Sequence, residues 1–79
     1  MKLTVKFFAR YREITGNDEV EIDVEDGSTV AGLIARLAEE YPGFPADPHM
    51  VAVNAEYIEG DAALNLGDEV AFFPPFSGG

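Results

Sequence analysis

The sequence predicts an α+β fold, in which a mixed sheet of four to five strands carries one main helix on one face. Two observations indicate this class: several short segments alternate between apolar and polar residues, and one segment between them repeats its apolar residues with the helical period. The chain has 79 residues, of which 47% are hydrophobic and 25% are charged, as is typical of a globular domain. A domain of this size buries only about 60% of its unfolded surface, so we expect modest stability.

The first part of the chain predicts two strands joined by a short helical connection. Residues 3–8 (LTVKFF) and 19–25 (EVEIDVE) both alternate with a period of two. The outward carboxylates of the second segment are typical of an edge strand, because charge discourages pairing with other chains. Residues 9–17 are too many for a tight turn, so we expect them to hold one turn of helix that Gly16 closes.

The main helix is expected after a turn at Asp26 and Gly27. Ser28 or Thr29 can cap its first turn, and the Pro-Gly pair at 42–43 ends it. Its apolar positions have the spacing of one helical face and are Val30, Leu33, Ile34, Leu37, Ala38 and Tyr41.

The rest of the chain predicts further strands separated by turns. In order, we expect a loop at 43–48, a strand at 50–54, a turn at 55–56, a strand stub at 57–58, a packed corner at 64–66 and a last strand at 69–73. His49, the only histidine, is expected to be a surface loop residue, and Asp61 a solvated charge.

The last strand is expected to lie parallel to the first at the centre of the sheet, an arrangement that resembles the ubiquitin-like β-grasp. The two strands then finish at the same end of the sheet. Phe8 and Phe73, which both point away from the core in this pattern, are expected to lie close together. They predict an apolar patch of the kind that marks a partner interface.

Composition limits the functions that this chain can have. Fifteen acidic and five basic residues give a net charge of −10, which is the wrong sign for binding nucleic acid or an anionic membrane and favours basic protein partners. There is no cysteine, phosphate-binding loop or metal-ligand spacing, so we expect no cofactor or metal of its own. No segment resembles an export signal or a membrane span, which indicates a cytoplasmic protein.

The C-terminal residues are the candidate functional segment. We expect residues 1–73 to form the domain and residues 74–79 (PPFSGG) to form an extended tail, because two prolines cannot continue a strand. A Gly-Gly end fits a narrow slot and leaves its carbonyl open to attack. A free carboxylate is a poor acyl donor, so a separate ATP-using enzyme is needed to activate it.

The segments VKFFA (residues 5–9), REITG (12–16) and GDEVAFFPPFSGG (67–79) closely resemble the small subunit of molybdopterin synthase, a sulfur-carrier family with a ubiquitin-like fold. This resemblance spans the whole chain. It implies a sulfur carrier that is itself a non-catalytic subunit of a sulfurtransferase complex.

The resemblance also implies the partners and the steps. An adenylyltransferase of the ubiquitin-activating type would adenylate the Gly79 carboxylate, and a sulfur donor enzyme would convert it to a thiocarboxylate. The large synthase subunit would then receive the tail and pass the sulfur to the pterin precursor of molybdenum cofactor biosynthesis. Gly79 is the reacting residue in this scheme, and the residues expected to bind partners are Gly78, Ser77, Phe76, Pro75, Pro74, Phe73 and Phe8.

Three other functions stay open on the sequence. The chain is also consistent with a ubiquitin-like modifier that is joined through Gly79 to lysines of target proteins, since the same adenylate serves both roles. It is consistent with a sulfur carrier for another acceptor, such as thiamin, cysteine or tRNA. A passive binding module is the third alternative.

Overall fold

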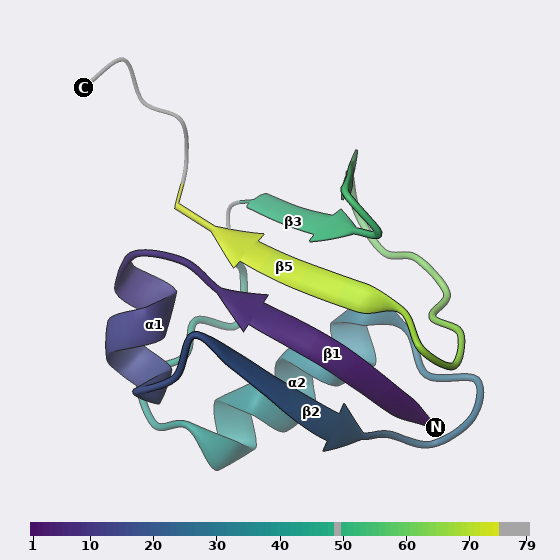
Figure 1. The fold of residues 1–79 in the computed structure, drawn as a ribbon, viewed down its shortest axis with the longest axis horizontal. Coiled ribbons are helices and arrows are strands. Elements are labelled where there is room, and N and C mark those ends of the chain that lie inside the picture. Colours follow the sequence, from purple (N-terminus) through teal and green to yellow (C-terminus); the bar gives the residue numbers. More distant parts are fainter. Residues whose placement is uncertain (49, 75–79) are drawn as a thin grey trace.

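The computed structural model of the protein describes residues 1–48 and 50–74. It consists of one five-stranded sheet, a long helix that crosses one of its faces, and a short helix at one end (Figure 1). His49 lies outside the described residues, as do the predicted site residues Pro75, Phe76, Ser77, Gly78 and Gly79.

The elements follow the predicted order. They are β1 (Lys2–Phe7), α1 (Arg10–Thr15), β2 (Glu19–Asp23), α2 (Val30–Glu40), β3 (Met50–Val53), β4 (Glu56–Ile58) and β5 (Glu69–Phe73). None of the helices in the described part of the chain is long and apolar enough to cross a membrane.

The strand order in the sheet is β2-β1-β5-β3-β4. The two central strands, β1 and β5, are parallel, and each of the other neighbouring pairs is antiparallel. A sheet of this topology with one long helix on one face is the ubiquitin-like β-grasp, so the predicted fold class is confirmed. The edge position predicted for residues 19–25 is also confirmed, because β2 has only β1 as a neighbour.

Local signals in the sequence explain the helix ends. Thr29 is the N-cap of α2 and accepts a hydrogen bond from the Gly32 amide, as its position before the apolar face predicts. Gly16 ends α1 with a left-handed φ of 75°, and its N–H donates to the Arg12 carbonyl over 2.8 Å.

The core lies between α2 and the inner face of the sheet. Phe7, Tyr11, Phe44 and Phe72 form its aromatic part, and the rings of Phe44 and Phe72 meet edge to face with centroids 5.3 Å apart. Phe44 belongs to a segment that the sequence predicted only as a loop. Leu64 fills the predicted corner, whereas Leu66 does not pack there and is 74% exposed.

The turn between β3 and β4 differs from the prediction by one residue. It consists of Asn54 and Ala55, with φ of 50° and 70°, and not of residues 55–56. Two hydrogen bonds explain the shift: the Asn54 amide N–H donates to the Glu69 carbonyl, and the Asn54 side-chain oxygen accepts from the Glu69 amide. Asn54 therefore links the hairpin turn to the start of β5.

Candidate functional site

The ends of β1 and β5 bring two aromatic residues together. Phe7 lies opposite Phe72 in the parallel register, and the Phe8 amide N–H donates to the Phe72 carbonyl over 3.2 Å. Because Phe7 and Phe72 point into the core, Phe8 and Phe73 point to the sheet face that α2 leaves uncovered. The predicted proximity of Phe8 and Phe73 is confirmed.

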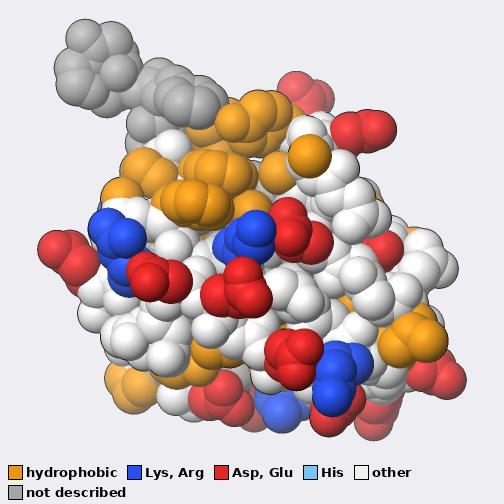
Figure 2. Space-filling model, in the orientation of Figure 1, with side chains coloured by type: hydrophobic (Ala, Val, Ile, Leu, Met, Phe, Trp, Pro, Cys, Tyr) orange, Lys and Arg blue, Asp and Glu red, His pale blue; other side chains and the backbone are white. Residues whose placement is uncertain are grey.

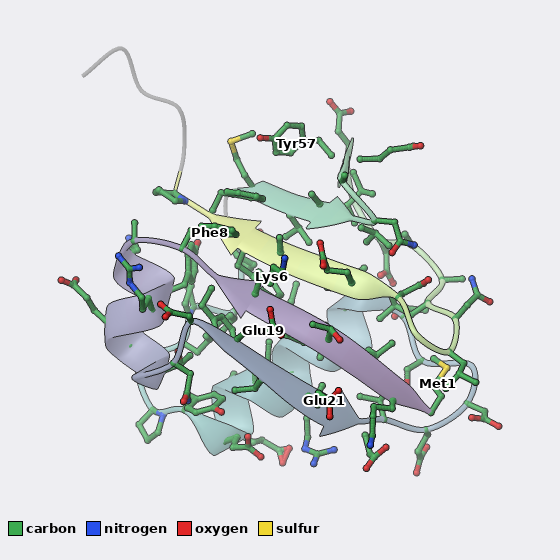
Figure 3. The ribbon with its side chains drawn as sticks, viewed as in Figure 1. Met1, Lys6, Phe8, Glu19, Glu21 and Tyr57 are labelled. Atoms are coloured by element: carbon green, nitrogen blue, oxygen red, sulfur yellow. The ribbon has the colours of Figure 1, made fainter. Side chains whose placement is uncertain are left out.

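The contact between these two rings is close. Phe8 and Phe73 stack with centroids 4.6 Å apart and planes within 7° of parallel. Tyr57 of β4 meets Phe73 from the other side, with centroids 5.8 Å apart and an angle of 62°. We call Phe8, Phe73 and Tyr57 the aromatic cluster; Figure 3 labels two of its members, Phe8 and Tyr57.

Tyr57 is the member that the sequence analysis missed. Residues 57–58 predicted only a stub of strand, but β4 pairs with β3 so that Tyr57 lies opposite Ala52, and Ile58 opposite Val51. Val51 and Ile58 face the helix side, so Tyr57 faces the outer side. Alternation alone predicts that direction; the distance to Phe73 depends on the strand order.

The aromatic cluster is the main apolar part of the outer face. Phe8 is 40% exposed and Tyr57 is 56% exposed, whereas Ala52 and Ala71, which lie between them on the same face, are buried. Figure 2 shows hydrophobic side chains gathered over the end of this face where β5 finishes, with charged side chains over much of the remainder. Such a patch with a charged border is typical of a protein-binding surface.

Three charged residues border the cluster. The Lys6 ammonium lies 3.2 Å from the Glu69 carboxylate, and Lys6 is opposite Glu19 in the sheet register (Figure 3). All three side chains are on the outer face: Lys6 and Glu19 are in the row next to Phe8, and Glu69 is one row further away, opposite Thr4. Border charges of this kind favour one orientation of a partner over others.

Chemically, the described part of this site offers exposed aromatic surface with a charged border and none of the groups that react in the predicted scheme. Pro74, the one residue of the predicted tail that the structure describes, directly follows Phe73 and is half-buried. Within residues 1–48 and 50–74, no three His, Cys, Asp or Glu side chains lie close enough to hold a metal ion. The reacting group of the predicted scheme is on Gly79, outside the described residues.

Asp61 is exposed to solvent, as the sequence predicted, but its carboxylate also makes backbone contacts that the sequence did not predict. Its carboxylate accepts hydrogen bonds from the backbone amides of Ala31, over 2.9 Å, and Ala62, over 2.8 Å. The bond from Ala31, in the first turn of α2, is the main reason that the pKa of Asp61 is lower than usual. Ala31 and Asp61 are 30 residues apart, so no local pattern predicts this contact.

Comparisons with known proteins agree along the whole chain. The molybdopterin synthase sulfur carrier subunit of Dictyostelium discoideum is 39% identical over 80 residues, covering 95% of this chain and 93% of the relative. Small archaeal modifier protein 3 of Haloferax volcanii is 35% identical over 92 residues, covering all of both chains.

Solved structures give the same result. SAMP1 from Haloferax volcanii is 30% identical with a TM-score of 0.82, and the match covers all of both chains. The match to a complex of subunits 1 and 2 of the molybdopterin-converting factor from Helicobacter pylori has 26% identity and a TM-score of 0.65, again over all of both chains.

The model of the ThiS family matches residues 5–79, which is nearly the entire chain. The predicted resemblance to the small subunit of molybdopterin synthase is confirmed by the relatives of that name. The chain belongs to the ThiS family, as a homologue of the sulfur carrier subunits of molybdopterin synthase.

Proposed function

We propose that this protein is a sulfur carrier of molybdenum cofactor synthesis, which is loaded on the carboxyl group of Gly79. The observation that carries the proposal is the position of the aromatic cluster. Phe73 is both a member of this cluster and the last residue of β5, so a partner bound there is next to the start of the tail at Pro74. The full-length similarity to sulfur carrier subunits supports the same function.

In the proposed reaction, the Gly79 carboxylate attacks the α-phosphorus of ATP, forming an acyl adenylate and releasing pyrophosphate. A sulfide sulfur then attacks the carbonyl carbon and AMP leaves, which gives a thiocarboxylate. Transfer of the sulfur to the pterin precursor, with oxygen supplied by water, restores the carboxylate. The sequence has no phosphate-binding loop, so in this proposal the adenylating enzyme is a separate protein. It also has no cysteine, so the sulfur comes from a separate donor.

The aromatic cluster would bind the large subunit of the synthase. The complex known for the Helicobacter pylori relative supports a two-subunit assembly. In this assembly Phe8, Phe73 and Phe76 contact the partner. Pro74 and Pro75 stiffen the exit of the tail, and Ser77 and Gly78 line the approach of Gly79. Burying these rings is favourable because the apolar surface leaves water.

The loading step is tested by incubating the protein with ATP, a candidate adenylyltransferase and sulfide, followed by intact-mass measurement. We expect a mass change that corresponds to one oxygen replaced by one sulfur. A variant with one residue added after Gly79 is the control and should stay unmodified. Loading of that extended variant to the same extent would contradict the proposal.

The docking step is tested by measuring affinity for the large subunit by calorimetry. Phe8→Ala and Phe73→Ala should each weaken binding, by about tenfold or more if these rings are central to the interface. Leu66→Ala is the matched control, since Leu66 is also apolar and exposed but is outside the cluster. Equal effects of all three substitutions would argue against docking through the aromatic cluster.

A second candidate function is protein modification, in which the activated Gly79 acylates lysines of target proteins. Its support is the similarity to small archaeal modifier proteins in both sequence and structure. Mass spectrometry of tryptic peptides from cells distinguishes the two functions. Isopeptide bonds between Gly79 and lysines indicate the modifier, and a terminal thiocarboxylate indicates the carrier.

A further inference from the structure

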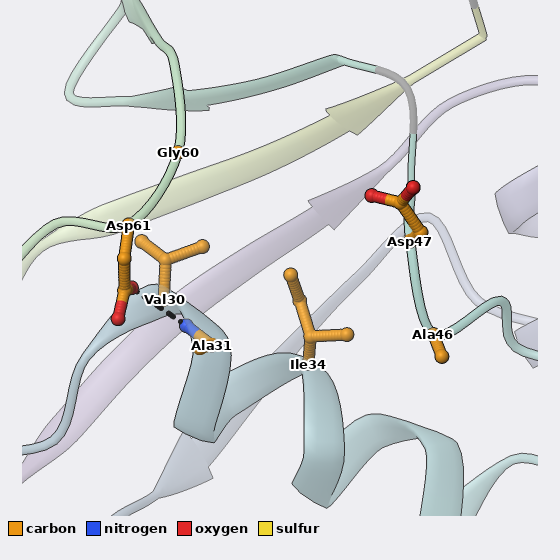
Figure 4. Close-up of a pocket in the computed structure, with 7 residues that line it drawn as sticks. All are labelled: Val30, Ala31, Ile34, Ala46, Asp47, Gly60 and Asp61. Atoms are coloured by element: carbon orange, nitrogen blue, oxygen red, sulfur yellow. Dashed lines mark hydrogen bonds between the residues drawn. The ribbon is translucent and has the colours of Figure 1, made fainter.

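A groove on the helix side of the molecule is not used by the proposed function. It lies between the N-terminal half of α2, the segment at residues 46–48 and the segment after β4 (Figure 4). It comprises two adjoining hollows of about 250 and 300 Å³ that share Val30, Ile34, Asp47 and Gly60. The aromatic cluster is on the opposite face of the sheet, so both surfaces are accessible at once.

The floor of the groove is apolar and its rim is acidic. Val30, Ile34 and Ile58 contribute aliphatic side chains, while Asp47, Glu59 and Asp61 contribute carboxylates. Among the described lining residues there is no cation. The five Lys and Arg residues of the chain line neither hollow: Lys2 and Lys6 are on β1, Arg10 and Arg12 on α1, and Arg36 on α2 outside the groove.

The charges of the rim select the sign of a ligand. Asp61 is held by the Ala31 amide, so its negative charge occupies the N-terminal end of α2, where an anionic ligand would otherwise be favoured. Asp47 and Glu59 are exposed and form no ion pair with any residue that the structure describes. A cation at the rim therefore gains attraction without breaking an ion pair among these residues.

The size of the groove limits the ligand further. Pockets for cofactors and drug-sized molecules commonly have volumes of about 300–1,000 Å³. Each of the two hollows, taken singly, is at or below the lower limit of this range, so each suits one side chain and the two together suit a short segment. A single long side chain fits better. Lysine and arginine pack their aliphatic stems on apolar surface while their charged heads reach carboxylates at its border.

We propose that this groove binds a short segment of a basic partner protein in which Arg or Lys is next to an aliphatic residue. The stem and the aliphatic neighbour cover Ile34 and Ile58, and the cationic head lies between Asp47 and Glu59. The site is separate from the aromatic cluster, so this partner can stay bound while another protein holds the outer face.

The probe for this proposal is the blocked peptide acetyl-Leu-Arg-Leu-amide, added to the full chain and followed by amide chemical shifts in NMR. We expect saturable shifts at Ile34, Asp47, Gly60 and Asp61 and little change at Phe8. The same peptide with neutral citrulline in place of arginine should bind at least about threefold more weakly.

Variants test the rim directly. The double variant Asp47→Asn/Glu59→Gln should weaken the arginine peptide by about threefold to tenfold, since two exposed ion pairs are lost. The matched control Glu25→Gln/Glu39→Gln removes the same charge elsewhere and should change the affinity by less than about twofold. All four side chains are exposed, so these variants should fold normally.

Three results would overturn the proposal: no saturable shifts at the groove, equal affinity for the citrulline peptide, or equal weakening by the control variant. The absence of saturable shifts would exclude the site. Equal affinity for the citrulline peptide would mean that binding depends on apolar contact alone, and equal weakening by the control variant would mean that only the overall negative charge of the protein matters. None of these results depends on sulfur loading, so failure here is distinct from failure of the proposed function.

Discussion

The stack of Phe8 and Phe73 makes a prediction about stability that needs no partner. The two centroids are 4.6 Å apart and the planes are nearly parallel. With planes at the usual contact distance of about 3.5 Å, this spacing requires a lateral offset of about 3 Å, which is the favourable offset arrangement. An aromatic pair of this kind contributes about 0.5–1.5 kcal/mol beyond its buried area.

A double-mutant cycle measures this contribution. Phe8→Ala and Phe73→Ala should each lower the free energy of unfolding by about 1–2 kcal/mol, because both rings are only partly buried. The loss of unfolding free energy in the double variant should be smaller than the sum of the two single losses by about 0.5–1.5 kcal/mol, and this difference is the coupling energy. A chain of 79 residues has a total stability of about 4–12 kcal/mol, so all four proteins should remain folded.

The assay is urea denaturation of the four proteins, followed by circular dichroism. With a slope of about 1 kcal/mol per molar urea, a coupling of this size shifts the midpoint by about 0.5–1.5 M. The control cycle pairs Phe8 with Leu66, which is in the loop beside the start of β1, about 20 Å away along the strand. The reasoning is refuted if the coupling of Phe8 and Phe73 is within about 0.3 kcal/mol of that control.

Three further predictions follow from the fold. Phe72→Ala removes a fully buried core ring and should lower the free energy of unfolding, measured by urea denaturation, by about 3–5 kcal/mol. This loss should be much larger than that of Phe73→Ala, and similar losses would contradict the assignment of these residues to opposite faces. Ala55→Gly should stabilise the protein by about 0.5–1 kcal/mol because Ala55 has a φ of 70°, which glycine adopts more easily. Ala35→Gly, on the exposed face of α2, should instead destabilise it by about 1 kcal/mol. If both substitutions shifted the melting temperature in the same direction, this explanation would be refuted. Asp61→Ala should lower the melting temperature at neutral pH, and the difference from the parent protein should shrink as the pH falls below about 4. The reason is that a carboxylate whose pKa is lowered in the folded state stabilises the fold only while it is ionised. A constant difference from pH 7 to pH 2 would exclude this origin.

The elements that the sequence predicted correctly are those specified by nearby residues. Alternation defined the strands, Thr29 and Gly16 marked helix ends, and the apolar face of residues 30–41 defined the main helix. The parallel pairing of β1 and β5 was predicted because the chain has one main helix, which can cross over and cover one face of the sheet. That pairing was enough to predict that Phe8 and Phe73 are neighbours.

The features that the sequence did not predict all depend on contacts between distant segments. Tyr57 joins the aromatic cluster because β4 pairs with β3 at the edge, and the sequence does not fix that position. Asp61 caps a helix that begins 31 positions earlier in the chain, at Val30. Phe44 enters the core from a loop, where no periodicity marks its direction.

The aromatic cluster and the core are specified by the same strand register. Phe7 and Phe72 stack on the inner face of the sheet with centroids 6.2 Å apart, and Phe8 and Phe73 stack on the outer face with centroids 4.6 Å apart. The parallel register of β1 and β5 aligns both pairs, and the Thr4 amide to Asp68 carbonyl bond of 3.0 Å fixes that register at the other end. A slip of β5 by one residue would turn Phe73 toward the core and Phe72 toward the outer face, and so separate Phe73 from Phe8.

This coupling gives the start of the tail a defined position. Phe73 cannot move relative to Phe8 without disturbing Phe72, which has no exposed surface and contacts Phe7 and Phe44. Core packing thus holds the last residue of β5 in a fixed place on the outer face, next to Pro74. A partner that recognises the aromatic cluster therefore meets the start of the tail at a position set by the core.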